Sequence, residues 1–568
     1  MSALFDELLR VRQVEPGFLN PKYEECLDPE VLPDIAKAVE RIQQAVERGE
    51  KILIYGDYDA DGVTASTVLH DTLELAGVKD IEIMLPNRFT DGYGMSTKVV
   101  QLAQEIGVKL VITVDCGSRN HEIVEQLNAT GVDVIITDHH ECAEDLPEAV
   151  AVVNPKRASW LSSDSVSLSK SNPSGRDLDP AQPKNNPQIA TKPVQAQLRE
   201  LAGVGVAFKL AQALVHVGMI PEGQEKWLLD LVLIGTVCDS MRLRGENRRL
   251  CYYGFKVLEK TRRVGLKELM LAAGVKKLNS ESVGFQVGPR LNAAGRMESA
   301  DLALQLLLAG SRPEAAALAM QLENLNEARK AQQQAALKEI ATRGVDGGAV
   351  MVECGDWHEG ILGIVAGKLV EQYHRPAIVL AETGEGYKGS GRSFGEFNLA
   401  EALVVCKDYI ISGGGHAEAC GLKVAKDKID EFRRAINAYY DGLELENQER
   451  FLDVHEDLQV TDFEQLSLEL VAELQKLEPY GTGNEEPIFL LPEVRVIEAA
   501  KLGADGKHLR LTVWDQNGKS LKLIQFFAPE EYLKLRGGET INAWITLGEN
   551  EYRGLRSVEG RIVKLAVV

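Results

Sequence analysis

An apolar run followed at once by three aspartates, "ILIYGDYDADGVTAS" (Ile52–Ser66), establishes the architecture of the N-terminal half. The run has the composition of a strand, and the residues after it have the composition of a helix. From here to Pro155, short apolar runs alternate with amphipathic stretches, which is typical of βα units. The runs are unbroken Val/Ile/Leu sequences, as expected for strands that are buried on both faces. The sequence therefore predicts a parallel sheet with helices on both sides.

Polar residues follow three of the predicted strands. Because the carboxyl ends of parallel strands meet at one edge of a sheet, we expect these side chains to converge. A single aspartate in such a place is more often a helix N-cap than a ligand, but the repetition at three strand ends favours a ligand cluster. Asp239, after the helical run "LVLIGTVC", is a further candidate carboxylate. The strand-end residues are Asp57, Asp59 and Asp61 after "ILIYG", Asp115 after "LVITV", and Asp138, His139 and His140 after "VDVIIT".

A cluster of this kind predicts bound divalent metal. Carboxylates within a few ångströms of one another raise one another's pKa unless cations lie among them. A site rich in oxygen ligands with few imidazoles favours Mn²⁺ or Mg²⁺ over Zn²⁺. Two such ions that share a bridging carboxylate are a common arrangement for in-line attack at phosphorus. The sequence therefore predicts two divalent metal ions, Mn²⁺ or Mg²⁺, as cofactors.

The overall composition narrows the class of protein. The 568 residues are 45% hydrophobic and 26% charged, as in a globular protein of several domains. The formal charge of -22 argues against a uniformly basic nucleic-acid binder, although metal ions and a local basic groove would offset it. The N-terminus lacks the pattern of a secretory signal, and no apolar run is long enough to span a bilayer. The eight cysteines are scattered, so we expect a cytoplasmic protein with no membrane partner.

Changes in composition divide the chain into segments. The stretch before the aspartate motif is helical in pattern, and a later stretch rich in serine and proline predicts a flexible surface insertion. Two glycine-rich segments, "GSGRS" and "SGGGH", predict turns whose N–H groups form a concavity for an anion. The predicted segments are a helical N-terminus (1–50), a catalytic domain (51–300) with the insertion (157–197), a connecting helix (301–345), a second α/β domain (346–448) and an OB-like barrel (449–568).

Several motifs resemble the DHH family of phosphoesterases. "GDYDADG", "DCG", "TDHH" and "CDS" occur in the order of that family. "GPRLNAAGR", "WHEGILGIVAGKL", "GGGHAEACG" and "LEPYGTGNEEPIF" resemble the RecJ nucleases of bacteria, and the resemblance covers nearly the whole chain except residues 157–197. It implies an α/β protein with a parallel-sheet catalytic lobe, a long connecting helix, a second, DHH-associated lobe that binds substrate, and a nucleic-acid-binding OB-like barrel. It also implies a metal-dependent exonuclease that hydrolyses single-stranded DNA from the 5′ end to mononucleotides in DNA repair and recombination, with a repair helicase or a single-strand-binding protein as a partner.

The resemblance also implies roles for single residues. As catalytic residues, Asp115 bridges the two ions, His140 faces the scissile phosphate, and Asp138 orients its neighbours. Tyr55 stands where small-molecule members of the family have a histidine ligand, which leaves the first ion one protein ligand fewer. The implied metal ligands are Asp59, Asp61, Asp115, His139 and Asp239, with Asp57 as a ligand or as a support. The implied substrate contacts are Arg88, Ser390 and Arg392 for the terminal 5′-phosphate, Arg290, Asn292 and Arg296 for the DNA backbone, and His416 near the substrate.

Two other functions fit parts of the sequence. A DHH phosphodiesterase for short oligonucleotides or cyclic dinucleotides needs the two α/β lobes alone, so the C-terminal barrel argues against it. A non-catalytic scaffold that binds single strands would have lost ligands, whereas every carboxylate of the RecJ pattern is present here. Release of mononucleotides from a single strand, but not from a cyclic dinucleotide, would separate the three functions.

Overall fold

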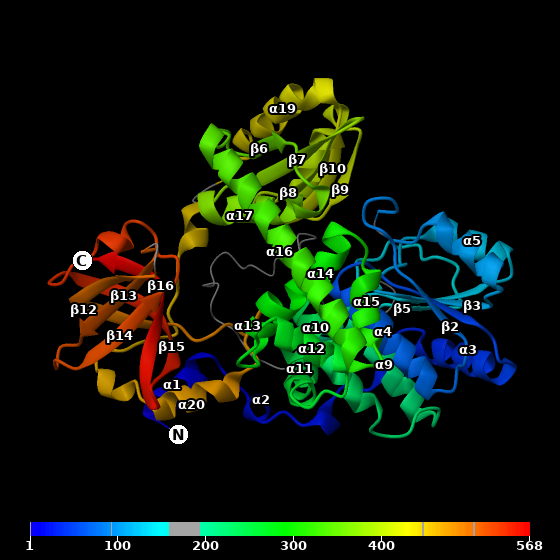
Figure 1. The fold of residues 1–568 in the computed structure, drawn as a ribbon, viewed down its shortest axis with the longest axis horizontal. Helices are drawn as coiled ribbons and strands as arrows, with labels where there is room; N and C mark the ends of the chain where they lie inside the picture. Colours follow the sequence, from blue (N-terminus) through cyan, green and yellow to red (C-terminus); the bar gives the residue numbers. More distant parts are fainter. Residues whose placement is uncertain (1, 93, 158–193, 446–447, 504–505) are drawn as a thin grey trace.

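The chain forms three bodies in the computed structural model (Figure 1). The first sheet and a group of helices form the catalytic lobe at the right and centre, a smaller lobe lies above them, and a β-barrel lies at the left. The long helix α16 (Arg312–Arg343) rises from the central helices into the upper lobe. The structure describes residues 2–92, 94–157, 194–445, 448–503 and 506–568.

The first sheet has the strand order β2-β1-β3-β4-β5, and each neighbouring pair is parallel. Alternate residues of β1 enter two cores: Ile52 and Ile54 pack with α3, α4 and α9, and Leu53 and Tyr55 pack with α5 and α6. The predicted parallel sheet with helices on both faces is confirmed. The bounds are β1 (Ile52–Tyr55), β2 (Ile81–Met84), β3 (Leu110–Val114), β4 (Asp133–Thr137), β5 (Ala151–Val153), α3 (Ile35–Arg48), α4 (Ala60–Leu75), α5 (Thr97–Ile106), α6 (His121–Ala129) and α9 (Gly203–His216).

Further helices complete the catalytic lobe. α10 packs against α4, α9 and α11, and its apolar residues are buried on nearly every side. The predicted insertion, 157–197, lies mostly outside the described residues, but its last four positions belong to α8, where Gln197 is buried. The insertion therefore ends earlier than predicted, because α8 packs against α11. The bounds are α8 (Val194–Leu198), α10 (Leu229–Cys238), α11 (Gly245–Leu258), α12 (Val264–Ala272), α13 (Ser280–Ser282), α14 (Gly288–Met297) and α15 (Asp301–Leu308).

The connecting helix α16 begins later than residue 301. The segment predicted as one helix is divided into α15 and α16, and α16 begins at Arg312. Pro313 explains the division, because its ring fits the first turn of a helix and lacks the N–H that a continuing helix needs. The first half of α16 packs against α12, α14 and α15, and its second half reaches α17 (Leu362–Tyr373) in the upper lobe.

The upper lobe contains a mixed sheet with the order β6-β7-β8-β10-β9. The predicted glycine-rich turns are wrong: "GSGR" lies in β8 and "SGGG" forms β9. Glycine permits close strands here, since a Cβ at Gly389 would lie 2.6 Å from the carbonyl oxygen of Val379. Because β8 pairs with β7 and β10, its backbone is engaged in the sheet. The bounds are β6 (Met351–Gly355), β7 (Ala377–Thr383), β8 (Gly386–Arg392), β9 (Ser412–Gly415), β10 (Ala419–Val424), α18 (Leu399–Val405) and α19 (Ile429–Asp441).

The predicted C-terminal barrel is confirmed. Its strands follow the order β12-β13-β14-β16-β15, and pairing of β12 with β15 closes the barrel. The N-terminal helix α1 (Ala3–Val11) adds Leu4, Phe5 and Leu8 to the barrel core, whereas α3 packs on the first sheet. Residues 1–50 are therefore divided between two bodies. The bounds are β11 (Leu458–Gln459), α20 (Leu468–Leu474), β12 (Phe489–Leu502), β13 (His508–Trp514), β14 (Ser520–Gln525), β15 (Thr540–Tyr552) and β16 (Leu555–Val567).

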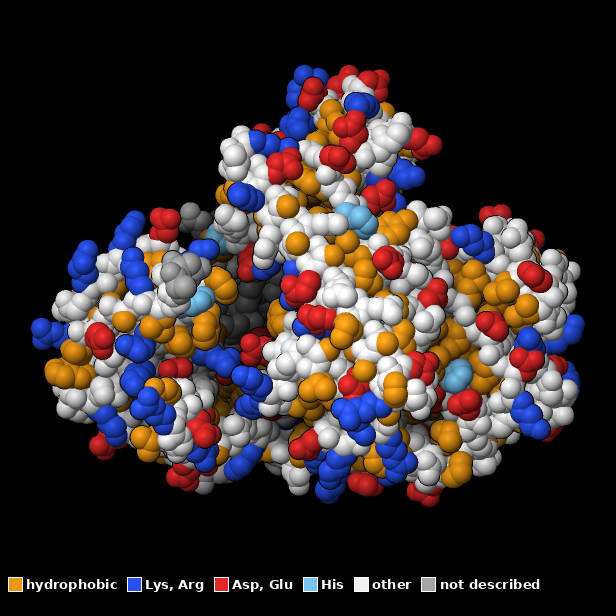
Figure 2. All heavy atoms as spheres, in the orientation of Figure 1, with side chains coloured by type: hydrophobic (Ala, Val, Ile, Leu, Met, Phe, Trp, Pro, Cys, Tyr) orange, Lys and Arg blue, Asp and Glu red, His pale blue; other side chains and the backbone are white. Residues whose placement is uncertain are grey.

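A cleft of about 910 Å³ separates the barrel from the helices of the catalytic lobe. Met241 and Phe285 lie on one wall, and Phe526 lies on the other. The space-filling view shows a hollow between the same two parts of the molecule (Figure 2). Among the described residues, no helix combines the length and the apolar character that crossing a membrane requires.

Candidate metal centre and substrate pocket

The first aspartate motif lies between β1 and α4. Asp59 is the N-cap of α4, and its Oδ1 accepts hydrogen bonds from the N–H groups of Asp61 and Gly62, each at 3.0 Å. Asp57 is buried, and its Oδ1 has no hydrogen-bond partner among the described residues. Burial, followed by the charge of Asp59, raises the pKa of Asp57 to about 8. The cap explains one oxygen of Asp59, and the exposed side of the motif carries carboxylate oxygens that are available to a cation.

Asp61 is held by the N-terminus of α9. Its two oxygens accept from the N–H groups of Gly203 and Val204 at 2.7 and 2.9 Å, which fixes the carboxylate by backbone donors. Burial and then Asp59 raise its pKa to about 7. Two glycines make room for the carboxylates: a Cβ at Gly203 would lie 2.6 Å from Asp115 Oδ1, and one at Gly235 would lie 2.7 Å from Asp61 Oδ1. The sequence analysis missed both, although a glycine inside the apolar run of α10 is an unusual choice that signals close packing.

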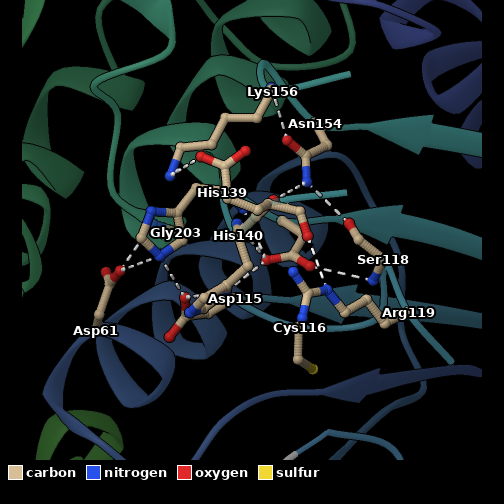
Figure 3. Close-up of polar contacts among 12 residues, drawn as sticks. Asp61, Asp115, Cys116, Ser118, Arg119, His139, His140, Asn154, Lys156 and Gly203 are labelled. Atoms are coloured by element: carbon tan, nitrogen blue, oxygen red, sulfur yellow. Dashed lines mark hydrogen bonds and ion pairs between the residues drawn. The ribbon is translucent and has the colours of Figure 1, made fainter. Parts of the chain in front are cut away.

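His139 joins the carboxylates of different elements. Asp115 follows β3 with a φ of 61°, a conformation rare outside glycine, and this turns its side chain into the cluster. His139 Nε2 lies 3.0 Å from Asp115 Oδ1, 3.8 Å from Asp61 Oδ2 and 3.6 Å from Asp239 Oδ2. The close-up shows the imidazole between Asp61 and Asp115, with the thiol of Cys116 directed away from both (Figure 3). Burial and the neighbouring His140 lower the pKa of His139 to about 3, so the ring is neutral and can bind a cation.

The donor groups fit two divalent ions. Burial and the adjacent carboxylates raise the pKa values of Asp115 and Asp239, because no cation offsets the repulsion. Their oxygen-rich composition, with two imidazoles, matches the ligand preference of Mn²⁺ and Mg²⁺. Three sets of ligand atoms lie within 4.8 Å of one another, and they are linked because Asp115 and His139 each occur in two of them. The sets are Asp57, Asp59 and Asp115; Asp115, His139 and His140; and Asp61, His139 and Asp239.

Asp138 positions its neighbours and has little capacity left for a metal ion. Its Oδ1 accepts from the N–H of His139 at 2.7 Å and of His140 at 3.1 Å, and lies 2.8 Å from His140 Nδ1. Its Oδ2 accepts from the N–H of Ser118 at 3.1 Å. Although burial alone would raise the pKa of Asp138, the hydrogen bond and charge of His140 hold it well below the usual range. Asn154, which the sequence analysis missed, donates to the carbonyl oxygen of His140 at 2.9 Å and fixes the same loop.

Arginines gather beside the metal centre. Arg88 stacks over Tyr58, with its Cζ 4.3 Å from the ring centroid. Arg392 Nη1 donates to Ser390 Oγ at 3.1 Å, and both side chains lie against the first turn of α17, where a Cβ at Gly363 would approach them to 2.9 and 3.1 Å. A helix N-terminus beside a guanidinium is suited to a phosphate. We infer from this geometry a pocket for an anion at the junction of the two lobes.

Arg296 joins this pocket to the metal centre. Its Nη1 donates to the carbonyl oxygen of Gly360 at 3.4 Å. Burial, then the like charges of Arg88 and Arg329, lower the pKa of Arg296 to about 9, whereas Asp59 acts in the opposite direction. Among the described residues, none of the pocket arginines forms an ion pair with a carboxylate. The pocket arginines are Arg88, Arg296, Arg329 and Arg392.

Three predicted substrate residues have other surroundings. Arg290 forms an ion pair with Glu323 of α16 through two of its nitrogens, one at 3.0 Å, and donates to the carbonyl oxygen of Gln286 at 2.7 Å. Its donors are engaged, so we withdraw it as a DNA contact. Asn292 Oδ1 accepts from the N–H of Ala60 at 2.9 Å and supports the aspartate motif. His416 is exposed beyond β9, where burial and the charges of Arg119 and His140 lower its pKa, so it approaches the centre from the upper lobe.

The fold and this site define a phosphoesterase of the DHH class. A family model of the DHH N-terminal domain matches residues 51–236, the DHHA1 domain matches 346–442, and the RecJ OB domain matches 457–564. Single-stranded-DNA-specific exonuclease RecJ of Haemophilus influenzae is 32% identical, with 98% of this chain and 95% of that protein covered. The chain belongs to the RecJ family.

Other relatives agree with this membership. RecJ of Bacillus subtilis is 35% identical over 93% of this chain, and the chain spans 64% of the length of that protein. The crystal structure of RecJ from Thermus thermophilus in complex with Mn²⁺ superposes with a TM-score of 0.77 at 29% identity, covering 100% of this chain and 78% of that chain. A second structure of the same protein contains Mg²⁺ and superposes with a TM-score of 0.71 at 27% identity, covering 100% of this chain and 77% of that chain.

Proposed function

We propose that the protein is an exonuclease that hydrolyses single-stranded DNA from its 5′ end to mononucleotides, in DNA repair and recombination. The observation that supports this most is the adjacency of two charge clusters of opposite sign. A carboxylate–histidine centre suited to two divalent ions adjoins arginines that lack carboxylate partners. A phosphodiester strand would satisfy both, because its phosphates bind to cations and to guanidinium groups alike.

We propose Asp57, Asp59, Asp61, Asp115, His139 and Asp239 as the metal ligands. When bound, two divalent ions supply charge neutralisation, polarisation of the phosphoryl group and an activated water. The chain orients these ligands through backbone donors at Asp61 and capping at Asp59. Asp138 holds His140 so that its ring can donate a hydrogen bond to the scissile phosphate, and His140 is favoured in its protonated form because Asp138 raises its pKa against the effect of burial.

The terminal pocket explains why we propose attack from an end. Arg88, Ser390 and Arg392 would hold the 5′-phosphate, and Arg296 would hold the backbone beside the metal centre. The barrel and the cleft would hold the rest of the single strand. Phe285 and Phe526 in this cleft are 79% and 62% exposed, which suits stacking on bases. We propose the boundaries 51–300, 346–448 and 449–568 for the three domains that share this task.

Partners and compartment follow from the same function. We propose that a repair helicase or a single-strand-binding protein supplies or presents the strand. The eight cysteines are all unpaired, which suits the reducing cytoplasm where such DNA would arise.

One substrate panel tests this proposal. A 5′-labelled single-stranded oligonucleotide, a duplex, a dinucleotide and a cyclic dinucleotide are each incubated with Mn²⁺ or Mg²⁺. We expect mononucleotides from the single strand at a much higher rate than from the other three. Preferred hydrolysis of the cyclic dinucleotide or the dinucleotide would instead favour a small-molecule phosphodiesterase, and binding without hydrolysis of any of them would favour a scaffold.

A further inference from the structure

The connecting helix α16 carries a polar interruption in its buried stripe. Its buried residues toward each end are alanine, leucine and isoleucine, which pack into the catalytic lobe and the upper lobe. Between them, where the helix passes from one lobe to the other (Figure 1), the buried residues are Asn326 and Arg329. Burial of polar groups costs free energy unless they find partners, so a pair in this place needs an explanation.

Arg329 has only weak internal partners. The residue is 8% exposed, and its Nη2 and Nη1 donate to the neutral amide oxygens of Asn326 at 3.0 Å and Gln333 at 3.3 Å. Within the part of the chain that the structure describes, its Nε has no acceptor. Asn326 is fully buried, and its Nδ2 also lacks an acceptor there. By contrast, Arg290, the neighbouring buried arginine, is neutralised by Glu323 on the same helix.

Arg329 faces the same space as the pocket arginines. Arg296 experiences Arg329 as its second-strongest like charge after Arg88, and it also experiences Asp59 of the metal centre. Guanidinium groups gathered in this way repel one another unless an anion lies among them. An ordinary structural arginine would be expected to reach one of the chain's own carboxylates. The missing partner is therefore an external anion that enters beside the metal centre.

We propose that Arg329 is a substrate-binding residue that holds an internal phosphodiester of the single strand, with Asn326 and Gln333 positioning its guanidinium group. This inference rests on the proposed function and adds a contact from the helix that joins the two lobes. Because Arg88, Ser390 and Arg392 serve the terminal phosphate, the phosphate at Arg329 lies farther along the strand. A bound strand would thus be gripped by the catalytic lobe, the upper lobe and the helix between them.

Arg329→Gln tests the inference, with Lys330→Gln as a matched control. Lys330 is the next residue on the helix, pairs with Glu327 and is largely exposed, so its removal changes the net charge equally. Binding of a 5′-phosphorylated single strand is measured in the presence of a chelator, where no hydrolysis occurs. We expect Arg329→Gln to bind about 10-fold more weakly. We also expect a plot of log affinity against log salt that is shallower by about 0.7, as for one lost phosphate contact. Lys330→Gln should change neither.

A scan with single neutral methylphosphonate linkages locates the contact. At one internal linkage, the neutral group should weaken binding to the wild type about 10-fold and leave binding to Arg329→Gln unchanged, since the contact is already lost. Without DNA, the unfolding midpoint of Arg329→Gln should equal or exceed that of the wild type, because a buried charge without a carboxylate partner has been removed. A structural role would lower the midpoint. If this variant fails to fold, Arg329→Met is measured in the same way.

Two results would overturn the inference. One is an unchanged salt dependence in the variant, and the other is a variant that still loses affinity at every linkage where the wild type does. These results are distinct from failure of the proposed function, which would appear as a wild-type protein that releases no mononucleotides.

Discussion

The metal centre and the arginine pocket are adjacent clusters of like charge, and they are assembled in opposite ways. The carboxylates come mainly from strand ends of one sheet, with Asp239 added from the end of α10. The arginines come from a loop after β2, from α14, from α16 and from β8, so two lobes and the helix between them contribute. Each cluster is electrostatically incomplete until an ion of the opposite sign binds.

The difference lies in how firmly each cluster is held before it binds anything. Backbone N–H groups fix Asp61 and Asp138, so these carboxylates keep their places in the absence of a cation. The pocket arginines extend on long side chains to carbonyl, hydroxyl and amide oxygens. Metal binding should therefore be a property of one rigid lobe, whereas phosphate binding should depend on the placement of two lobes.

The largest effect is expected from Asp115→Asn. Asp115 belongs to two ligand sets, so its loss weakens both ion sites and removes several kcal/mol of stabilisation of the transition state. We expect hydrolysis of single-stranded DNA to fall about a thousandfold or more. DNA binding in chelator should be retained or strengthened, because one negative charge is removed. The exposed Asp145→Asn in the same lobe is the control, and hydrolysis by Asp115→Asn at the wild-type rate would exclude the proposed centre.

A smaller effect is expected from Gly203→Ala, which tests whether the rigidity of the metal centre matters. The added Cβ would lie 2.6 Å from Asp115 Oδ1 and displace that carboxylate. We expect the Mn²⁺ concentration for half-maximal activity to rise about 10- to 100-fold. Gly205→Ala, one half-turn farther along α9, is the matched control, because its Cβ meets the flexible end of Leu201 at 3.1 Å. Equal Mn²⁺ dependence in the two variants would show that the carboxylate tolerates displacement.

The sequence was sufficient to predict the metal centre because short-range rules act there. Strand ends in a parallel sheet share an edge, so aspartates after several strands must meet. The glycines that accommodate them could not be predicted in the same way, since Gly203 and Gly235 are separated from the aspartate motif by more than a hundred residues. Their role depends on how α9 and α10 pack against α4.

The arginine pocket was predicted in part, and the errors are informative. Resemblance suggested Arg290, but its position on α14 brings it within reach of Glu323 on α16, which engages its donors. Arg329 belongs to a helix whose sequence is polar throughout, so nothing local distinguishes it from its exposed neighbours. Its burial follows from the passage of α16 between two lobes. Likewise, "GSGR" was predicted as a turn because glycine is common in turns, whereas close strand packing is the actual reason.

Arg392→Gln should have a moderate effect that depends on the end of the DNA. Arg392 and Ser390 lie at the first turn of α17, so we expect affinity for a 5′-phosphorylated strand to fall about 10-fold. A strand with a 5′-hydroxyl should show little change, since the contact is absent in both proteins. Lys423→Gln, an exposed position on the neighbouring strand β10, serves as the control. An equal loss for both kinds of end would assign Arg392 to a different phosphate.

The smallest effect on DNA is expected from Arg290→Gln, which separates a neutralised arginine from an unneutralised one. Removal of one partner of the Arg290–Glu323 pair leaves a partly exposed carboxylate, so we expect a loss of about 1–2 kcal/mol in the free energy of unfolding. Urea denaturation measures this loss. The salt dependence of DNA binding should stay at the wild-type value, in contrast to Arg329→Gln. A shallower dependence in Arg290→Gln would mean that the strand displaces Glu323, and the division between the two arginines would then be wrong.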